Sequence, residues 1–128
     1  MATNAVGDIH GNLEALTEIL DQIRGHGGPS DTIVFLGDYM DRGPNTKGCI
    51  DAILEFQREI EAEVVCLLGN HEDWFLRTLR DYGCHSWLLG MEAFDTIRSY
   101  SVDAVGTLRK AASNAGAQLY LGQPCPTV

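Results

Sequence analysis

The chain has 128 residues, 45% of them hydrophobic and 21% charged, so it suits a single domain with a modest core. Its formal net charge is −9, and it has two lysines, Lys47 and Lys110. This composition argues against binding to nucleic acid or to an anionic membrane, because either needs a basic face. No apolar run approaches the length of a membrane span and the amino terminus has no signal-peptide pattern, so we expect a cytoplasmic protein. The four cysteines form no C-x-x-C pair, which favours structural thiols over a disulfide or a zinc site.

The first predicted strand and helix enclose a short polar motif. Residues 3–6 are apolar enough for a strand that ends at Gly7, so Asp8 and His10 follow its carboxyl end. Asn12 is a good helix cap, and apolar residues spaced three and four positions apart then predict an amphipathic helix. These residues are Leu13, Leu16, Leu20 and Ile23, and the stretch from Gly25 to Pro29 ends the helix.

The second predicted strand leads into an unusual polar cluster. Residues 32–36 are β-branched and apolar without alternation, which is typical of a strand buried on both faces of a parallel sheet. A polar cluster follows, with the sequence Gly37-Asp38-Tyr39-Met40-Asp41-Arg42-Gly43-Pro44. Its charged residues are unsuited to a hydrophobic core, although we expect Tyr39 and Met40 to pack. Asp38 can bridge two cations, Asp41 can orient a neighbouring acid or base, and Arg42 can clamp an oxyanion through its fork of donors.

A second helix, a third strand and a third helix complete this part of the chain. Pro44 and Asn45 open the second helix, in which Ile50, Ile53 and Leu54 should face the core. Residues 63–68 repeat the strand pattern and end on Gly69-Asn70-His71-Glu72. Beyond residue 81 the pattern indicates short helices near 87–89 and 94–100, a helix capped by Asp103, and a short strand at 119–121.

This order of elements predicts an α/β fold with a parallel β-α-β-α-β sheet core over residues 1–80. A helical segment and tail over residues 81–128 would complete the same domain. Open α/β sheets build their sites beyond the carboxyl ends of the strands, so the three polar clusters should meet at one edge. Other residues near the clusters have structural interpretations: Glu72 as a charge that complements a helix dipole, and Trp74 and Trp87 as core or lid aromatics.

Read in order, GDIHG, GDYMDRG and GNHE resemble the motifs of the calcineurin-like metallophosphoesterases. Within that family they are similar to the phosphoprotein phosphatase branch, which includes small bacterial phosphatases and diadenosine tetraphosphatases. Asp8, Asp38 and Asn70 mark the motifs at intervals of 30 and 32 residues. The resemblance covers residues 5–72 well and 87–100 more faintly, and it implies the amino-terminal half of the family's sandwich fold.

The resemblance implies a site for two divalent cations. In the family these ions lie about 3.5–4 Å apart, clamp a phosphoryl group and activate a water as the nucleophile. By motif position Asp8 and His10 would hold the first ion, Asp38 would bridge the two, and Asn70 would hold the second. Mn²⁺ is the expected metal, with Fe or Zn²⁺ as alternatives, because mixed carboxylate, carbonyl and imidazole donors suit those ions.

Three further residues receive catalytic roles from the resemblance. His71 would protonate the leaving oxygen as a general acid, Asp41 would orient it, and Arg42 would bind the phosphate oxygens. The implied reaction is metal-dependent hydrolysis of a phosphomonoester, as in serine/threonine phosphatases, or of a dinucleoside polyphosphate. The expected partner is therefore a phosphorylated protein or a nucleotide.

The sequence departs from the family pattern after the third motif. Family members supply two later histidines to the second metal and a second sheet that packs on the first. Of the remaining histidines, His26 is expected in a solvated loop, and His85 is a candidate substitute ligand. A second metal site made of Asp38 and Asn70 alone should be weak unless water, phosphate or another chain completes it.

Two expectations follow from this departure. A sheet without its partner sheet would expose an apolar face, so we expect the chain to form a homo-oligomer. The alternative function is a truncated, catalytically weak module that binds a metal, phosphate or a partner protein. A Rossmann-type nucleotide domain is disfavoured, because no G-x-G-x-x-G turn follows the first strand.

Overall fold

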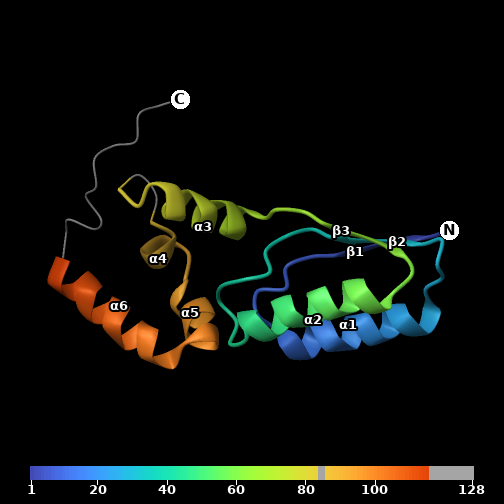
Figure 1. Cartoon of the computed structure of the whole chain (residues 1–128), viewed down its shortest axis with the longest axis horizontal. Helices are drawn as coiled ribbons and strands as arrows, with labels where there is room; N and C mark the ends of the chain where they lie inside the picture. Colours follow the sequence, from blue (N-terminus) through green and yellow to red (C-terminus); the bar gives the residue numbers. More distant parts are fainter. Residues whose placement is uncertain (84–85, 116–128) are drawn as a thin grey trace.

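Helices and strands alternate along the first 80 residues of the chain (Figure 1). The computed structural model describes residues 1–83 and 86–115. Within them the elements are β1 (Thr3–Val6), α1 (Leu13–His26), β2 (Thr32–Phe35), α2 (Thr46–Glu59), β3 (Glu63–Cys66), α3 (Asn70–Arg80), α4 (Trp87–Gly90), α5 (Phe94–Tyr100) and α6 (Val102–Ala115). None of these helices has the length and apolar composition needed to span a membrane.

The three strands form one parallel sheet in the order β1-β2-β3. Val6, Phe35 and Cys66 are aligned across it, so the three strands end in the same row. Helices α1 and α2 run along the same face of the sheet, below it in Figure 1. This arrangement confirms the predicted α/β fold class and is consistent with the amino-terminal half of a calcineurin-like fold.

The core lies between the sheet and helices α1 and α2. Ile33 and Phe35 of β2 are fully buried there, and Phe35 meets the ring of Phe56 edge-to-face at 6.3 Å. The apolar face predicted for α1 is confirmed, since Leu16 and Leu20 are buried in the same cluster. Asn12 caps α1 as expected, and its side chain accepts a hydrogen bond from the backbone N–H of Ala15 at 3.2 Å.

The opposite face of the sheet is not covered by the described residues, and we call it the open face. Ala5, Val34 and Val65 are aligned across it, with Val34 and Val65 partly buried and Ala5 exposed. Leu36 and Leu67, two positions further along, are 50% and 46% exposed. The expectation that β2 is buried on both faces is therefore wrong, because full burial needs a second layer on this face.

Two predicted helix details are also wrong. In α2 the buried positions are Thr46, Cys49, Ile53 and Phe56, whereas Leu54 is 44% exposed. Steps of three, four and three residues place these four side chains on one face, and Leu54 lies to its side. Helix α6 begins at Val102, so Asp103 lies in its first turn, and Ser101 Oγ accepts from the backbone N–H of Ala104 at 3.3 Å instead. The strand predicted at 119–121 lies outside the described residues.

The cysteines of the described part of the chain, Cys49 and Cys66, are free. Burial raises the pKa of the Cys49 thiol to about 11, so this residue is protonated and acts as a small hydrophobic side chain in α2. Cys49 agrees with the prediction of a buried structural thiol, whereas Cys66, the last residue of β3, is exposed. Cys84 and Cys125 lie outside the described residues.

The close approach of Gly37 to Gly69 allows a stability test. Gly37 has φ +98°, and a Cβ there would overlap the backbone of Gly69. We expect Gly37→Ala to lower the free energy of unfolding by about 2 kcal/mol or more, because it adds backbone strain to a clash. Gly25, inside α1 with no atom within 4 Å of a Cβ, is the matched control. Gly25→Ala should stabilise by up to about 1 kcal/mol. Urea unfolding would measure both, and equal effects would contradict the close approach.

Candidate functional site

The loops that follow β1 and β2 are joined to each other beyond the ends of the strands. The backbone N–H of His10 donates to the carbonyl of Asp38 at 2.8 Å, and that of Gly11 donates to the carbonyl of Tyr39 at 2.9 Å. Gly43 packs so closely on His10 that a Cβ would overlap its carbonyl oxygen. The first and second polar motifs therefore meet at one edge of the sheet, as the parallel topology predicts.

A metal-ligating cluster lies at this edge. One ligand atom from each of Asp8, His10 and Asp38 lies within 4.8 Å of the other two. Nδ1 of His10 lies 2.9 Å from the carbonyl oxygen of Met40. A carbonyl can only accept, so Nδ1 carries the proton and Nε2 keeps its lone pair for a metal. Two carboxylates and an imidazole in this state fit a divalent transition metal such as Mn²⁺, Fe²⁺ or Zn²⁺.

Asn70, the fourth predicted ligand, is the first residue of α3 and reaches the same carboxylate. When its amide nitrogen faces Asp38, it donates to the two carboxylate oxygens at 2.9 and 3.2 Å. The third motif thus joins the other two at Asp38, which is the position expected of a residue that bridges two metal sites. The structure places all four predicted metal ligands together.

Next to this cluster lies a buried pair of titratable residues. Asp41 is fully buried and His71 is 3% exposed, and His71 Nδ1 lies 2.8 Å from Asp41 Oδ2. The ring of His71 meets that of His10 edge-to-face, with 4.8 Å between the centroids. The predicted acid and its orienting carboxylate are therefore in hydrogen-bond contact beside the candidate metal ligands.

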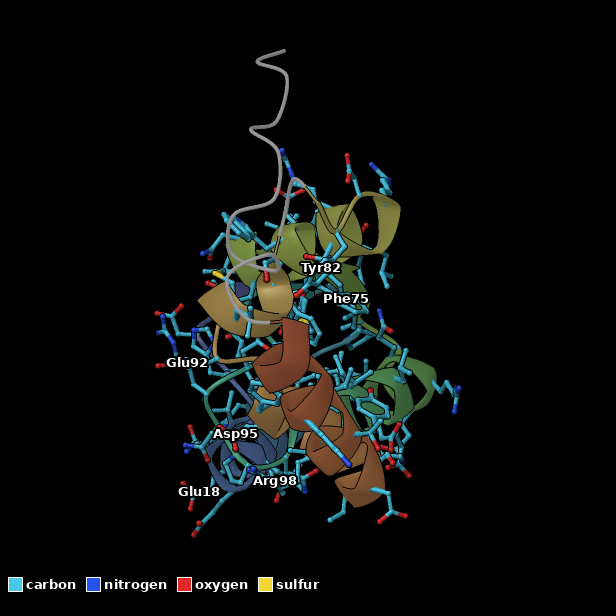
Figure 2. All side chains as sticks on the ribbon, turned by 90° about the vertical axis from the view of Figure 1, so that its left-hand side faces the viewer. Glu18, Phe75, Tyr82, Glu92, Asp95 and Arg98 are labelled. Atoms are coloured by element: carbon cyan, nitrogen blue, oxygen red, sulfur yellow. The ribbon has the colours of Figure 1, made fainter. Side chains whose placement is uncertain are left out.

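Arg42 lies at the surface next to this pair. Its Nε is 3.3 Å from a carboxylate oxygen of Glu92, in the connection between α4 and α5, and both side chains are more than half exposed. Figure 2 shows Glu92 at the outside of the molecule. An exposed pair of this kind contributes at most about 1 kcal/mol, so an anionic ligand can displace Glu92 from the guanidinium.

Backbone strain is concentrated in these same residues. Non-glycine residues seldom adopt positive φ, and each such position costs about 1–3 kcal/mol unless the side chain tolerates it. Strain of this kind gathers at functional sites, where the surrounding structure enforces it. Within the described residues, the non-glycine residues with positive φ are Asp8, His10, Asp38, Asp41, Arg42 and Glu92. Five of these six are the predicted metal and catalytic residues, and the sixth is the partner of Arg42.

Glu72 has a role that the sequence interpretation missed. It lies in the first turn of α3, as expected, but its carboxylate also holds the loop that carries Asp38. Oε2 accepts from the backbone N–H groups of Asp38 and Gly69 at 2.8 and 3.0 Å, and Oε1 accepts from that of Tyr39 at 2.8 Å. The spacing from Gly69 to Glu72 is that of a capping box and could have indicated the local bond, but not the bonds to Asp38 and Tyr39.

Two more residues were missed because they lie beyond the last motif. Trp87 is buried against Phe75 as a core aromatic, which agrees with its prediction, but its indole nitrogen also donates to Asp41 Oδ2 at 2.7 Å. Thr96 donates to Asp41 Oδ1 at 2.7 Å. The sequence around each residue contains no motif that indicates a role in a polar site. Trp74, by contrast, is 39% exposed.

Of the two remaining histidines, His26 lies away from the site. His26 is the last residue of α1, where Nδ1 lies 2.9 Å from the carbonyl of Gln22. A helix of 14 residues is about 21 Å long, and α1 begins next to the site, so His26 lies at its far end. The prediction of a loop position is therefore wrong, because His26 belongs to the helix, whereas its exposure and its place away from the site agree with the prediction. His85 lies outside the described residues.

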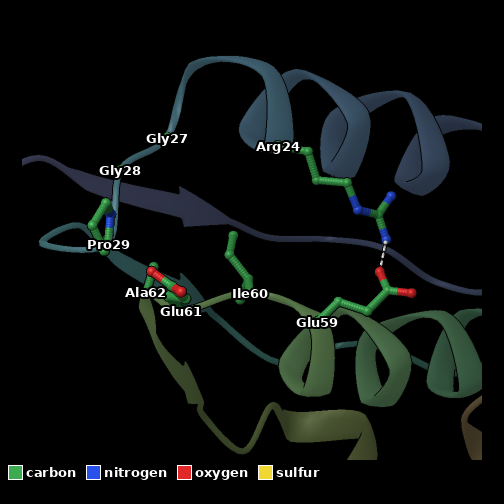
Figure 3. A pocket seen from close by; sticks show the side chains of 8 residues that line it. All are labelled: Arg24, Gly27, Gly28, Pro29, Glu59, Ile60, Glu61 and Ala62. Atoms are coloured by element: carbon green, nitrogen blue, oxygen red, sulfur yellow. Dashed lines mark hydrogen bonds and ion pairs between the residues drawn. The ribbon is translucent and has the colours of Figure 1, made fainter.

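A hollow at the opposite end of the sheet is separate from this chemistry. It lies where α1 and α2 end, and Arg24 in its wall pairs with Glu59 at 3.0 Å (Figure 3). A larger hollow of about 680 Å³ has Met40, Phe75 and Trp87 among its mainly apolar lining residues. The hollow beside Arg24 and the candidate site therefore lie at opposite ends of the sheet.

The role of Glu72 predicts a loss of stability on an isosteric change. In Glu72→Gln an amide nitrogen would replace one carboxylate oxygen and face backbone N–H donors. We expect the free energy of unfolding to fall by about 2 kcal/mol, the value of charge-assisted hydrogen bonds lost from a partly buried site. Glu55→Gln, on the exposed side of α2, is the matched control and should change it by less than about 0.5 kcal/mol. A neutral effect of Glu72→Gln in urea unfolding would contradict the assigned role.

Comparison with known proteins places the chain in a family. Residues 1–119 match the family model described as calcineurin-like phosphoesterase. A zinc-dependent endopolyphosphatase of Saccharomyces cerevisiae is 36% identical over 67 residues, which are 52% of this chain and 19% of that protein. A symmetrical bis(5'-nucleosyl)-tetraphosphatase of Stutzerimonas stutzeri is 40% identical over 73 residues, 56% of this chain and 24% of that protein.

A third relative is a serine/threonine-protein phosphatase, PP2A-like PPG1, of Candida albicans. It is 37% identical over 86 residues, which are 67% of this chain and 20% of that protein. The chain thus spans less than a quarter of the length of each of these three relatives. The family match, in contrast, extends over nearly all of the chain and includes the three motifs. The chain belongs to the calcineurin-like phosphoesterase family.

Proposed function

We propose that this chain carries the catalytic edge of a metal-dependent phosphoesterase. The observation that supports this most strongly is the meeting of Asp8, His10 and Asp38 with the buried pair Asp41 and His71, in which all but His71 have a positive φ. The relatives are named for cleavage of polyphosphate, dinucleoside tetraphosphate or phosphoprotein. Hydrolysis of a phosphoric ester or anhydride is the chemistry that these names share.

The metal ligands are proposed as two overlapping sets. Asp8, His10 and Asp38 would hold one ion, and Asp38 with Asn70 would contribute to a second. Bound divalent ions would supply a water activated as nucleophile and would neutralise the phosphoryl oxygens. We propose Mn²⁺ as the metal, with Fe or Zn²⁺ as alternatives, and a cytoplasmic location remains a prediction from the sequence.

The chain's own residues would protonate the leaving group and bind the charged phosphate oxygens. Nδ1–H of His71 donates to Asp41, so in the acid form of the ring, in which both nitrogens carry a proton, the Nε2 proton would pass to the leaving oxygen. Arg42, once released from Glu92, would bind the phosphate oxygens through its fork of donors. The substrate is proposed to be a phosphomonoester on a protein or nucleotide, or a dinucleoside polyphosphate.

Hydrolysis of 4-nitrophenyl phosphate tests this function. We expect turnover by the 128-residue chain with Mn²⁺, loss of turnover with a chelator, and recovery when the metal is restored. Asp38→Asn should lower kcat/KM by about a hundredfold or more, because it removes the residue shared by both ligand sets. Asp51→Asn, an exposed α2 residue paired with Lys47, is the matched control and should keep full activity. A folded chain without metal-dependent turnover would favour the alternative, a module that binds metal or phosphate.

We also propose that a second copy of the chain covers the open face. Apolar side chains from all three strands reach it, and none of the described helices packs there. A contiguous apolar surface of this kind favours association. The expected arrangement is a homo-oligomer in which the open faces of two copies meet.

Light scattering would measure this association. We expect a mass above that of the monomer at micromolar concentration, and a shift towards monomer in Leu36→Gln. Leu54→Gln is the matched control, because Leu54 is similarly exposed but lies on α2, away from the open face. A monomeric wild-type chain would contradict the proposal, and so would an equal shift in both variants.

A further inference from the structure

The carboxylate of Asp41 is held from three other elements at once. His71 of α3 and Trp87 of α4 both meet Oδ2, at 2.8 and 2.7 Å, and Thr96 of α5 meets Oδ1 at 2.7 Å. Each of these side chains is at most 6% exposed. The two contacts from beyond the last motif join residues 46 and 55 positions apart in the sequence. Asp41 is therefore the point to which the segment after the motifs is attached.

The protons of this network have one consistent assignment. The backbone N–H of Asp41 donates to Thr96 Oγ1 at 2.7 Å, so this oxygen is an acceptor there. The single hydroxyl proton of Thr96 then points to Asp41 Oδ1. Thr46 Oγ1 lies 3.0 Å from Thr96 Oγ1 and must be the donor in that contact, because the Thr96 proton is already used. Thr96 thus clamps both the backbone and the side chain of Asp41, at a position with φ 70°.

These hydrogen bonds to Asp41 restrict the orientation of the His71 ring. The indole N–H of Trp87 is a donor only, and it occupies one side of Oδ2 while Thr96 occupies Oδ1. The carboxylate cannot rotate without breaking at least one buried hydrogen bond, which is costly in a site closed to water. His71 therefore finds its acceptor in one fixed place, donates from Nδ1, and keeps Nε2 directed away from Asp41.

We propose that Trp87 and Thr96 are positioning residues that fix the ring orientation and tautomer of His71 by clamping Asp41. This proposal rests on the proposed function, in which His71 protonates the leaving oxygen. It extends the catalytic unit beyond the three motifs to α4 and α5. A packing role alone does not require these polar atoms, because apolar groups of similar shape would fill the same space without burying donors and acceptors.

Three variants and two controls test the proposal. Trp87→Phe removes the indole donor but keeps an aromatic ring next to Phe75, and Thr96→Val replaces the hydroxyl by a methyl group. Thr96→Ser keeps the hydroxyl and should restore wild-type behaviour. Trp74→Phe and Thr17→Val make the same chemical changes at positions outside the network. Thr96→Val also leaves the Asp41 N–H without its acceptor, so Trp87→Phe keeps the test valid if that variant does not fold.

The first measurement needs no activity. Nitrogen-15 NMR of the His71 ring in the metal-free full chain reports which ring nitrogen carries the proton. At a pH where the ring is neutral, we expect the Nδ1–H tautomer to dominate in the wild type, Thr96→Ser and both controls, and a mixture of tautomers in Trp87→Phe and Thr96→Val; the acid form of the wild-type ring adds its second proton at Nε2. Unchanged ring signals in Trp87→Phe would overturn the proposal.

The second measurement compares substrates that differ in leaving group. If His71 loses its orientation, phenyl phosphate should be affected more than 4-nitrophenyl phosphate, because its poorer leaving group depends more on the acid. We expect kcat to fall about tenfold or more for phenyl phosphate and less than about threefold for 4-nitrophenyl phosphate. Equal slowing of both substrates would overturn the proposal. A wild type without turnover would overturn the proposed function, while the ring signals would still decide whether Trp87 and Thr96 position His71.

Discussion

The structure around the site depends on one buried carboxylate, that of Asp41. A fully buried acid is tolerated only when its oxygens are hydrogen-bonded. Removing one member of a buried ion pair typically costs about 3–5 kcal/mol, because the other member is left without its partner. Asp41 satisfies this requirement with donors from three different helices, His71, Trp87 and Thr96. Because the acid lies in the loop after β2, these bonds tie the helices that follow the sheet to the edge where the metal ligands meet.

A second constraint is the strained backbone of the loops that carry the ligands. Positive φ angles at Asp8, His10 and Asp38 are unfavourable in isolation. They persist because backbone hydrogen bonds join the first two loops and because the Glu72 carboxylate binds the N–H groups of the second. Close glycine contacts allow the loops to approach in this way. The protein's own hydrogen bonds thus hold the ligand set together, which reduces the ordering that metal binding would require.

The described residues cover one side of the sheet, and the candidate site is not built on the other side. The residues of the candidate site lie in loops and in helices α3, α4 and α5. The open face consists of apolar residues in or next to the strands, such as Val34 and Leu36. The family match covers residues 1–119, while the curated relatives described above are several times longer. The chemistry proposed for the sheet edge and the association proposed for the open face therefore involve different residues.

The sequence by itself predicted the order of the elements and the sheet edge at which the motifs meet, and the resemblance of those motifs to the family supplied the candidate site residues. The order and the edge were predictable because strand and helix periodicity is local, and because parallel strands bring their carboxyl ends together. An apolar strand has the same pattern whether or not a second layer covers it, so the strand pattern indicated burial on both faces, and only the family resemblance led to the expectation of an exposed apolar face. The exposure of Leu54 was not expected. Only the tertiary structure assigned Glu72, Trp87 and Thr96 to the site. Their bonds to Asp38 and Asp41 span 34, 46 and 55 residues, and no local pattern records a contact that depends on how distant helices pack.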